Sequence, residues 1–210
     1  MYKLTLSLVT IVLLFSQSAI SQIDKSDWEG GFPDGCTSIT VGKQASADGS
    51  VMTSHTDDSH RTRSWMDIQP AKTHEEDATV TMYKRVSTDS LAMPAYAHKP
   101  IGEIPQVEKT YGYINTAYPC LNTKQLAMGE STFGGREELQ SEEGLIDCQR
   151  LCQLMLERCT TAREAIEMAD ELTKKYGWND AGECLTIADP NEVWHFEIVG
   201  PGKGKVGGIW

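Results

Sequence analysis

The residues Gly35-Cys36-Thr37 stand immediately before a stretch with the polar and apolar alternation of a strand. If the peptide bond before Cys36 is cut, this residue becomes a new N-terminus that carries a thiol and an α-amine together. The thiol can attack an amide carbonyl, and the amine, with an ordinary pKa of about 7.7–8.0, can accept the thiol's proton. Because the ordinary pKa of a thiol is about 8.5, this transfer needs no separate base. Cys36 is therefore the candidate nucleophile.

The charge and the cysteines of the chain exclude other classes of site. The 210 residues carry a formal net charge of -11 without a cluster of Lys and Arg, so we expect no nucleic-acid partner. The six cysteines include no CxxC pair, and Cys148 and Cys152 lie one helical turn apart, which suits burial better than zinc. We expect no metal and no cofactor. If Cys36 is a free thiol, five cysteines remain, so at least one more must be unpaired.

The first 21 residues are typical of an export signal. Lys3 precedes an apolar run over residues 4–15, and Ala19-Ile20-Ser21 offers the small residues that a signal peptidase recognises. The run is shorter than the about 20 residues that span a bilayer, so we expect no stable membrane anchor. The sequence predicts an exported protein, periplasmic or extracellular. Residues 22–35 are polar and contain glycine, as in a linker or pro-segment, and residues 36–210 follow as the folded domain.

Short alternating segments indicate strands in the first and last parts of this domain. An Asp48-Gly49 turn joins the first two into a hairpin, and residues 93–105, with three prolines and a glycine, are expected to form a loop. Residues 118–122 are interpreted as a turn. The predicted strands cover residues 37–43, 50–56, 78–86, 110–117, 125–128, 183–188 and 192–199.

Two helices are predicted between these groups of strands, over 147–159 and 161–176. Apolar residues recur at spacings of three and four in both, Thr161 with Glu164 forms a capping box, and Gly177 ends the second helix. The order strands, helices, strands predicts an α+β sandwich. The chain stops at Gly207-Gly208-Ile209-Trp210, where an apolar segment begins, so we expect an incomplete N-terminal portion of a longer domain.

The run from Cys36 to Ser50, CTSITVGKQASADGS, followed by HTDDS over residues 55–59, resembles the start of the C69 dipeptidases. These are N-terminal-nucleophile hydrolases, related to secernins and more remotely to bile-salt hydrolases and penicillin V acylases. The resemblance extends to Trp210 through GESTFGG at 129–135 and WHFE at 194–197. It implies an αββα sandwich of two stacked antiparallel sheets between helix layers, in which removal of the pro-segment releases Cys36.

The resemblance also implies roles for the end of the second strand. The superfamily places Arg-x-x-Asp there, and the matching residues are His55 and Asp58, so Asp58 takes the carboxylate role and His55 replaces the arginine. A neutral imidazole lowers the pKa of a thiol less than a guanidinium does, although a protonated His55 beside Asp58 would partly compensate. Asp57 is the alternative orienting group.

An oxyanion hole and a binding group for substrate complete the expected site. Ser131, or a backbone N–H near it, is the candidate donor to the oxyanion. Asn122 is a second candidate, but its setting after Pro119 is more typical of a turn. A dipeptidase must recognise a free α-ammonium, which Asp57 or Glu130 could bind by a charge-assisted hydrogen bond.

Three functions agree with these residues. The first is a cysteine-type dipeptidase that hydrolyses small peptides through an acyl-enzyme on Cys36. The second is an N-acyl amide hydrolase with the same mechanism. The third is a non-catalytic module like the secernins. The mature N-terminus separates the enzymes from the module, because an enzyme begins at Cys36 and the module at Gln22.

Overall fold

The computed structural model describes residues 35–58, 66–88 and 95–210. The expected signal peptide over residues 1–21 and residues 22–34 of the expected pro-segment lie outside the described residues. Neither of the two α-helices in the described part is long and apolar enough to cross a membrane.

The described elements alternate as expected for an α+β protein, with strands on both sides of a helical segment. The strands are β1 (Gly35–Val41), β2 (Met52–Asp58), β3 (Asp67–Gln69), β4 (Lys72–Thr73), β5 (Thr79–Thr88), β6 (Ala95–Pro105), β7 (Lys109–Thr110), β8 (Tyr113–Asn115), β9 (Pro119–Asn122), β10 (Ala127–Gly134), β11 (Gly182–Ala188) and β12 (Val193–Ile198). The helices are the short 3-10 helix η1 (Glu137–Leu139) and the α-helices α2 (Cys148–Arg158) and α3 (Ala162–Tyr176).

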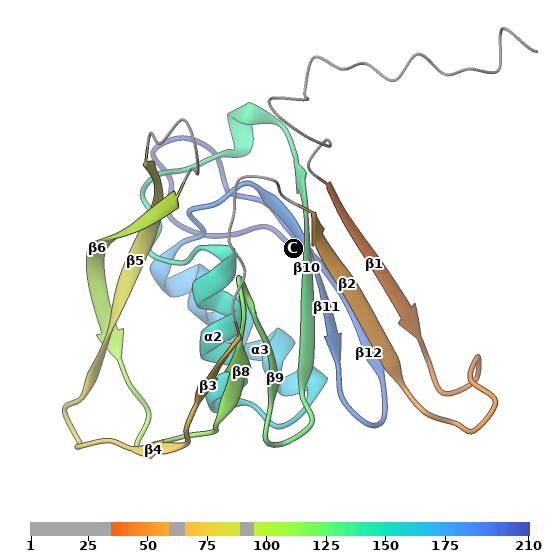
Figure 1. Ribbon diagram of the computed structural model, residues 1–210. Coiled ribbons are helices and arrows are strands. Elements are labelled where there is room, and N and C mark those ends of the chain that lie inside the picture. The colour runs from red at the N-terminus through yellow and green to blue at the C-terminus, as the bar shows by residue number, and fades with distance from the viewer. Residues whose placement is uncertain (1–34, 59–65, 89–94) are drawn as a thin grey trace, which may run out of the picture. The chain divides into compact units, whose positions relative to one another are not determined.

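One antiparallel sheet forms the centre of this part of the chain. Among the described strands its order is β12-β11-β10-β9-β8-β3, while β1 pairs with β2, β4 with β7 and β5 with β6 in separate ribbons. Figure 1 shows the β1–β2 hairpin on one side of β10 and β11 and the helices on the other. The described part therefore has three layers, which are the helices, the central sheet and the hairpin.

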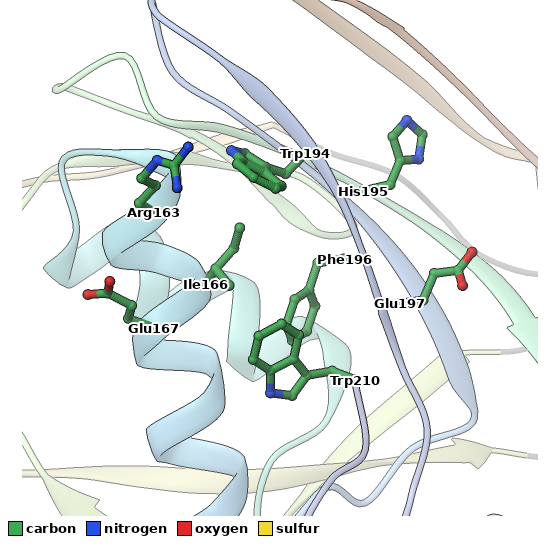
Figure 2. Close-up of a pocket in the computed structure, with 8 residues that line it drawn as sticks. All are labelled: Arg163, Ile166, Glu167, Trp194, His195, Phe196, Glu197 and Trp210. Atoms are coloured by element: carbon green, nitrogen blue, oxygen red, sulfur yellow. The ribbon is translucent and has the colours of Figure 1, made fainter.

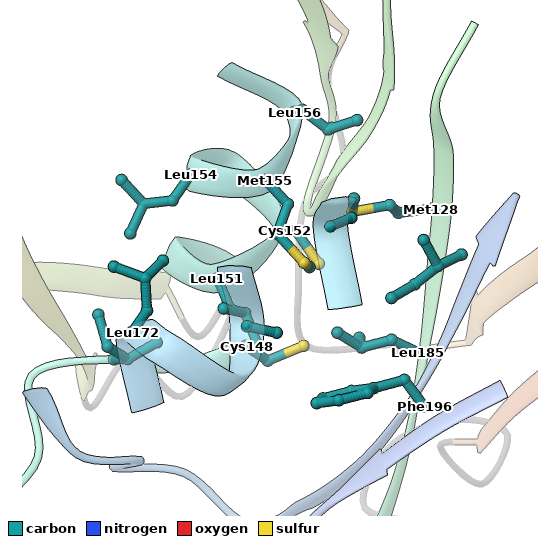
Figure 3. Close-up of a cluster of buried hydrophobic side chains, with 14 of the residues drawn as sticks. Met128, Cys148, Leu151, Cys152, Leu154, Met155, Leu156, Leu172, Leu185 and Phe196 are labelled. Carbon is teal, nitrogen blue, oxygen red and sulfur yellow. The ribbon is translucent and has the colours of Figure 1, made fainter. Parts of the chain in front are cut away.

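The hydrophobic core lies between the helices and the central sheet. Its side chains include one stripe of α2, the buried face of α3 with Leu172, and alternate positions of β10, β11 and β12, such as Met128, Leu185 and Phe196 (Figure 3). The α2 stripe has the predicted spacing, and its residues are buried at Cys148, Leu151, Cys152 and Met155. Burial of this apolar area, at about 25 cal/mol per Å², is the main force that holds the helices to the sheet.

The ends of the helices confirm the predicted boundaries. Thr161 caps α3, since its side chain accepts from the backbone N–H of Glu164 and the Glu164 carboxylate accepts from the backbone of Thr161. Gly177 ends α3 with a φ of 76°, a left-handed value that glycine adopts without steric cost. The Asp147 carboxylate caps α2 by accepting from the N–H of Arg150.

The hairpin is fixed to the central sheet by hydrogen bonds between polar side chains. The Ser38 and Ser131 hydroxyls are 2.7 Å apart, and the Thr53 hydroxyl donates to the Thr186 hydroxyl at 2.9 Å. The outer face of the hairpin is open, with Ile39 62% and Met52 48% exposed. The interface between hairpin and sheet is thus partly polar, and Cys36 lies at one end of it.

Two predictions of secondary structure from the sequence were wrong, over residues 95–105 and 119–122. Residues 95–105 form strand β6 rather than a loop, because β6 belongs to a two-stranded ribbon in which Pro100 lies at a shift of register opposite Tyr83. A proline cannot donate to a ladder but is tolerated at such an irregularity or on an open edge. Residues 119–122, interpreted as a turn, form β9, and the turn lies between β9 and β10.

Candidate active site

Cys36 occupies the second position of β1 and lies opposite Asp57 of β2. Side chains alternate across a strand, so Cys36 and Ser38 share one face of β1 and are half-buried, while Thr37 and Ile39 are exposed. Their partners across the hairpin are Asp57 and His55. The pairing therefore brings the thiol and one carboxylate to the face that meets the central sheet.

The Cys36 sulfur lies in an acidic environment that also offers backbone donors. Its Sγ, a carboxylate oxygen of Asp57 and a carboxylate oxygen of Glu130 all lie within 4.8 Å of one another. Burial, followed by the negative charges of Glu130 and Asp57, raises the pKa of the Cys36 thiol, while hydrogen bonds from the backbone N–H groups of Thr132 and Asp58 act in the opposite direction. These surroundings therefore favour the protonated, less nucleophilic form of the thiol.

The two adjacent aspartates have different roles in the geometry. The Asp58 carboxylate accepts from the Thr56 hydroxyl at 2.9 Å on the exposed face of β2, and only its backbone N–H is directed at the Cys36 sulfur. The Asp57 carboxylate is the one close to the sulfur. The structure thus brings together Cys36 and the alternative orienting residue, Asp57, and directs the Asp58 side chain elsewhere.

His55 lies between the hairpin and β10. A Cβ atom placed on Gly129 would be 2.6 Å from His55 Nδ1, so the imidazole packs directly against the backbone of β10. Burial lowers the pKa of His55, and the nearby charge of Asp57 only partly opposes this. The lowered pKa disfavours the imidazolium form of His55, which is the form that would replace the arginine of the superfamily at this position.

Substituting Gly129 with alanine is expected to separate the hairpin from the central sheet. The new Cβ would lie 2.6 Å from His55 Nδ1 and 2.8 Å from Thr186 Oγ1, closer than packed atoms tolerate. We expect the free energy of unfolding in urea to fall by about 1–3 kcal/mol. The control is Gly42→Ala, whose Cβ would meet nothing within 4 Å. Equal stability of the two variants would contradict the proposed packing.

Ser131 is hydrogen-bonded to Ser38 rather than directed at the thiol. The adjacent residue, Thr132, provides the backbone N–H near the Cys36 sulfur. Among the described strands, β10 pairs with β9 only at Ala127, which leaves the end of β10 near Cys36 without a neighbour on that side. A backbone N–H beside Ser131, the alternative donor predicted from the sequence, is therefore the one that the geometry offers. Asn122 bonds the carbonyls at the end of α2 and the turn after β9, and its role is structural.

A buried carboxyl pair adjoins the site, and its second member was missed from the sequence. Glu130 is 1% and Glu183 2% exposed, and a carboxylate oxygen of each lies within 4.8 Å of the other. The Thr132 hydroxyl donates to Glu183 Oε1 at 2.8 Å. The signal for Glu183 is the strand alternation, since it shares the buried face of β11 with Leu185 and Ile187. A charged residue on such a face marks an unusual environment.

Two groups of side chains in the described residues have ligand atoms close enough to hold a cation. One contains Cys36, Asp57 and Glu130, and the other Glu130, Cys148 and Glu183. Glu183 Oε2 is buried and has no hydrogen-bond partner among the described groups. One proton shared between Glu130 and Glu183 satisfies this oxygen, and we interpret the pair in this way.

The carboxyl pair predicts that stability falls as the pH rises. Burial is the largest cause that raises the pKa of Glu183, and the neighbouring Glu130 acts in the same direction through a hydrogen bond and its negative charge. Together they raise this pKa to about 9. The folded state thus binds more protons than the unfolded state, whose carboxyl has a pKa of about 4.3, so the free energy of unfolding decreases between these values. We expect urea unfolding to show a smaller decrease between about pH 5 and about pH 8 for Glu183→Gln than for the unsubstituted protein. Parallel profiles would contradict this.

An aromatic cavity of about 480 Å³ lies apart from the Cys36 cluster, between α3, β12 and the last residues of the chain (Figure 2). The Arg163 guanidinium lies 4.9 Å from the centre of the Trp194 ring, and the Phe196 and Trp210 rings are 5.2 Å apart. The cavity shares no lining residue with the cluster around Cys36. Its lining residues are Arg163, Ile166, Glu167, Trp194, His195, Phe196, Glu197 and Trp210.

The family model of peptidase family C69 matches residues 35–210, from the residue before Cys36 to the last residue. The chain belongs to peptidase family C69. The match begins at Gly35, so the C69 segment contains Cys36, Asp57 and the carboxyl pair, and it leaves out the expected signal peptide.

Curated relatives agree with the C69 assignment. A probable dipeptidase of Latilactobacillus sakei is 29% identical over 174 residues, which cover 78% of this chain and 35% of the relative. Probable dipeptidase B of Lactococcus lactis subsp. lactis is 28% identical and covers 79% and 35%, and a dipeptidase of Bifidobacterium longum is 25% identical and covers 79% and 33%. The chain spans about a third of the length of these relatives.

Proposed function

We propose that this protein is a cysteine-type dipeptidase whose nucleophile is Cys36, exposed as an N-terminal residue when the preceding segment is removed. The observation that carries the proposal is the position of Cys36 at the start of β1, opposite Asp57 and within reach of the backbone donors of Asp58 and Thr132. Membership of a peptidase family and relatives named dipeptidase support the same activity.

The mechanism follows from the groups that cleavage leaves at one residue. The Cys36 α-amine accepts the proton of the thiol, and the sulfur attacks the carbonyl carbon of the peptide bond. The amine of the product leaves with that proton, and a thioester remains on Cys36. Water then attacks the thioester, gives a proton to the α-amine, and releases the acid product and the thiol.

The acidic surroundings of Cys36 favour a thiol that becomes reactive only after the preceding segment is removed. Before cleavage, burial and the charges of Glu130 and Asp57 raise the pKa of the thiol. Cleavage creates an α-amine on Cys36 itself, next to the Asp57 carboxylate, and the ammonium group that forms when this amine takes the proton of the thiol stabilises the thiolate. The proposed role of Asp57 is to orient this ammonium group, with the backbone N–H of Thr132 as a donor near the reacting carbonyl.

Substrate recognition and the full fold extend the proposal. The α-ammonium of a dipeptide would be bound by a carboxylate, and Asp57 is better placed for it than Glu130, which is 1% exposed. We place the described layers within the αββα sandwich of N-terminal-nucleophile hydrolases. In that arrangement further elements of a longer protein cover the outer face of the hairpin, where Ile39 and Met52 are exposed.

Export through the signal peptide over residues 1–21 belongs to the same proposal, and the mature N-terminus tests it together with the mechanism. We expect mass spectrometry of the purified native protein to give a start at Cys36, and the protein to hydrolyse dipeptides faster than their N-acetylated forms. A preference for the N-acetylated forms would favour an N-acyl amide hydrolase. A protein that keeps residues before Cys36 and cleaves dipeptides at full rate would contradict the mechanism.

A further inference from the structure

Glu130 belongs to two groups of side chains that meet at its carboxyl. One group contains the Cys36 sulfur and the Asp57 carboxylate, and the other contains Cys148 and Glu183, with the ligand atoms of each group within 4.8 Å of one another. Glu130 is therefore the link between the thiol on the hairpin side and a carboxyl in the core of the protein.

The register of β10 and β11 places both carboxyls on one face of the sheet. Thr132 lies opposite Glu183 and Glu130 opposite Leu185, so Glu130 and Glu183 are diagonal neighbours on the face that meets the helices. The Thr132 hydroxyl has one proton, and it is 2.8 Å from Glu183 Oε1 but 3.5 Å from Glu130 Oε2. Thr132 therefore serves Glu183, and the Glu183 carboxyl lies close enough to Glu130 to share a proton with it.

The close approach of the two buried carboxyls requires a proton between them. Both residues are almost completely buried, and Glu183 Oε2 has no other donor among the described groups. Two ionised carboxylates in contact in the core would repel each other, whereas one shared proton gives a hydrogen bond and leaves one negative charge. The titratable groups that face Glu130 are Cys36, Asp57, Arg85, Tyr118, Cys148, Asp180 and Glu183.

We propose that Glu183 is a positioning residue for Cys36, which shares one proton with Glu130 and so keeps a single negative charge on the carboxyl that faces the Cys36 sulfur. Glu183 acts only through Glu130 and does not contact the sulfur. The inference rests on the proposed function only in that it treats Cys36 as the nucleophile. Its consequence is that a change at Glu183, in the core, alters the reactivity of the thiol.

The test is the rate at which iodoacetamide alkylates Cys36 in the full chain as a function of pH, followed on the Cys36 peptide by mass spectrometry. In Glu183→Leu the lone buried Glu130 carboxyl takes up a proton. The midpoint of the curve of Cys36 alkylation rate against pH is therefore expected to fall by about one pH unit. The rate at about pH 8 should rise about threefold, because a thiolate of lower pKa is also a weaker nucleophile. Glu130→Gln should give the same shift.

Glu183→Gln is the rescue variant, because its amide donates to Glu130 at every pH and preserves the single charge. At about pH 8, below the pKa of about 9 at which Glu183 loses its proton, we expect it to keep the alkylation rate of the unsubstituted protein, as should the control Glu197→Gln, a change of an exposed residue on β12. Coinciding curves for Glu183→Leu and Glu183→Gln would overturn the proposal. If Glu183→Leu does not fold, the two amide variants decide, since equal midpoints for Glu130→Gln and Glu183→Gln would also overturn it.

Alkylation needs no peptide hydrolysis, so the two proposals can fail separately. A shifted midpoint in a protein without dipeptidase activity would leave the role of Glu183 intact and remove the proposed function. An active dipeptidase whose Cys36 alkylation midpoint is the same in all the variants would support the proposed function and overturn the role of Glu183.

Discussion

Replacing Cys36 with alanine is expected to lower kcat/KM for dipeptide hydrolysis by at least about a thousandfold, to the uncatalysed background. The reason is that the proposed mechanism passes through a thioester on this sulfur, and the other groups near it, Asp57 and Glu130, are carboxyls that cannot take its place. The measurement is the steady-state rate of dipeptide cleavage by the purified mature protein.

The matched control for this change is Cys184→Ala. Cys184 is also a half-buried free thiol, on β11, and its Sγ lies 3.6 Å from His195 Nδ1. A cysteine and a histidine in contact resemble a catalytic pair, yet neither belongs to the Cys36 cluster. We expect activity within about twofold of the unsubstituted protein. Loss of activity in Cys184→Ala with retention in Cys36→Ala would place the nucleophile on β11.

Replacing Trp178 with alanine is expected to reduce the free energy of unfolding by about 3–5 kcal/mol. The Trp178 side chain is completely buried, and its Nε1–H donates to the Ala181 carbonyl at 2.9 Å. Its removal leaves a large cavity between the end of α3 and the start of β11, together with an unpaired carbonyl. Urea unfolding followed by circular dichroism measures the change.

Trp194→Ala is the comparison for this second prediction. Trp194 is 37% exposed and lines the aromatic cavity beside Arg163, so its removal creates little buried empty volume. We expect a change within about 1 kcal/mol. If both tryptophan variants lost the same stability, the contrast between buried and surface packing would be wrong.

The elements that local patterns specify strongly were predicted well. The helix stripes and the Thr161 capping box predicted α2 and α3, and the Asp48-Gly49 turn predicted the β1–β2 hairpin. Each of these signals lies within a few residues of the element it defines. Strand β6 was missed because its prolines oppose a strand locally, and only pairing with β5 stabilises it.

The residues of the candidate site also divide into those that the sequence indicated and those that only the folded chain brings together. The sequence located Cys36, and the resemblance drew attention to residues 55–58 and 129–135. It assigned the carboxylate role to Asp58, with Asp57 as the alternative. Two adjacent strand residues face opposite sides, so which of them meets Cys36 depends on the register with β1. Glu183 lies more than fifty residues from Glu130 in the chain, and no local pattern connects them.

The sequence by itself singled out Cys36 as the candidate thiol and determined the hairpin that carries it and the helices that cover the sheet. The hairpin and the helices depend on side-chain periodicity and on turn and cap residues. Only the tertiary structure decided which carboxylates meet the Cys36 sulfur, that His55 is buried against Gly129, and that Glu130 and Glu183 form a pair. The physical reason is that the register between strands and the packing between layers set these contacts, and both are properties of the folded chain as a whole.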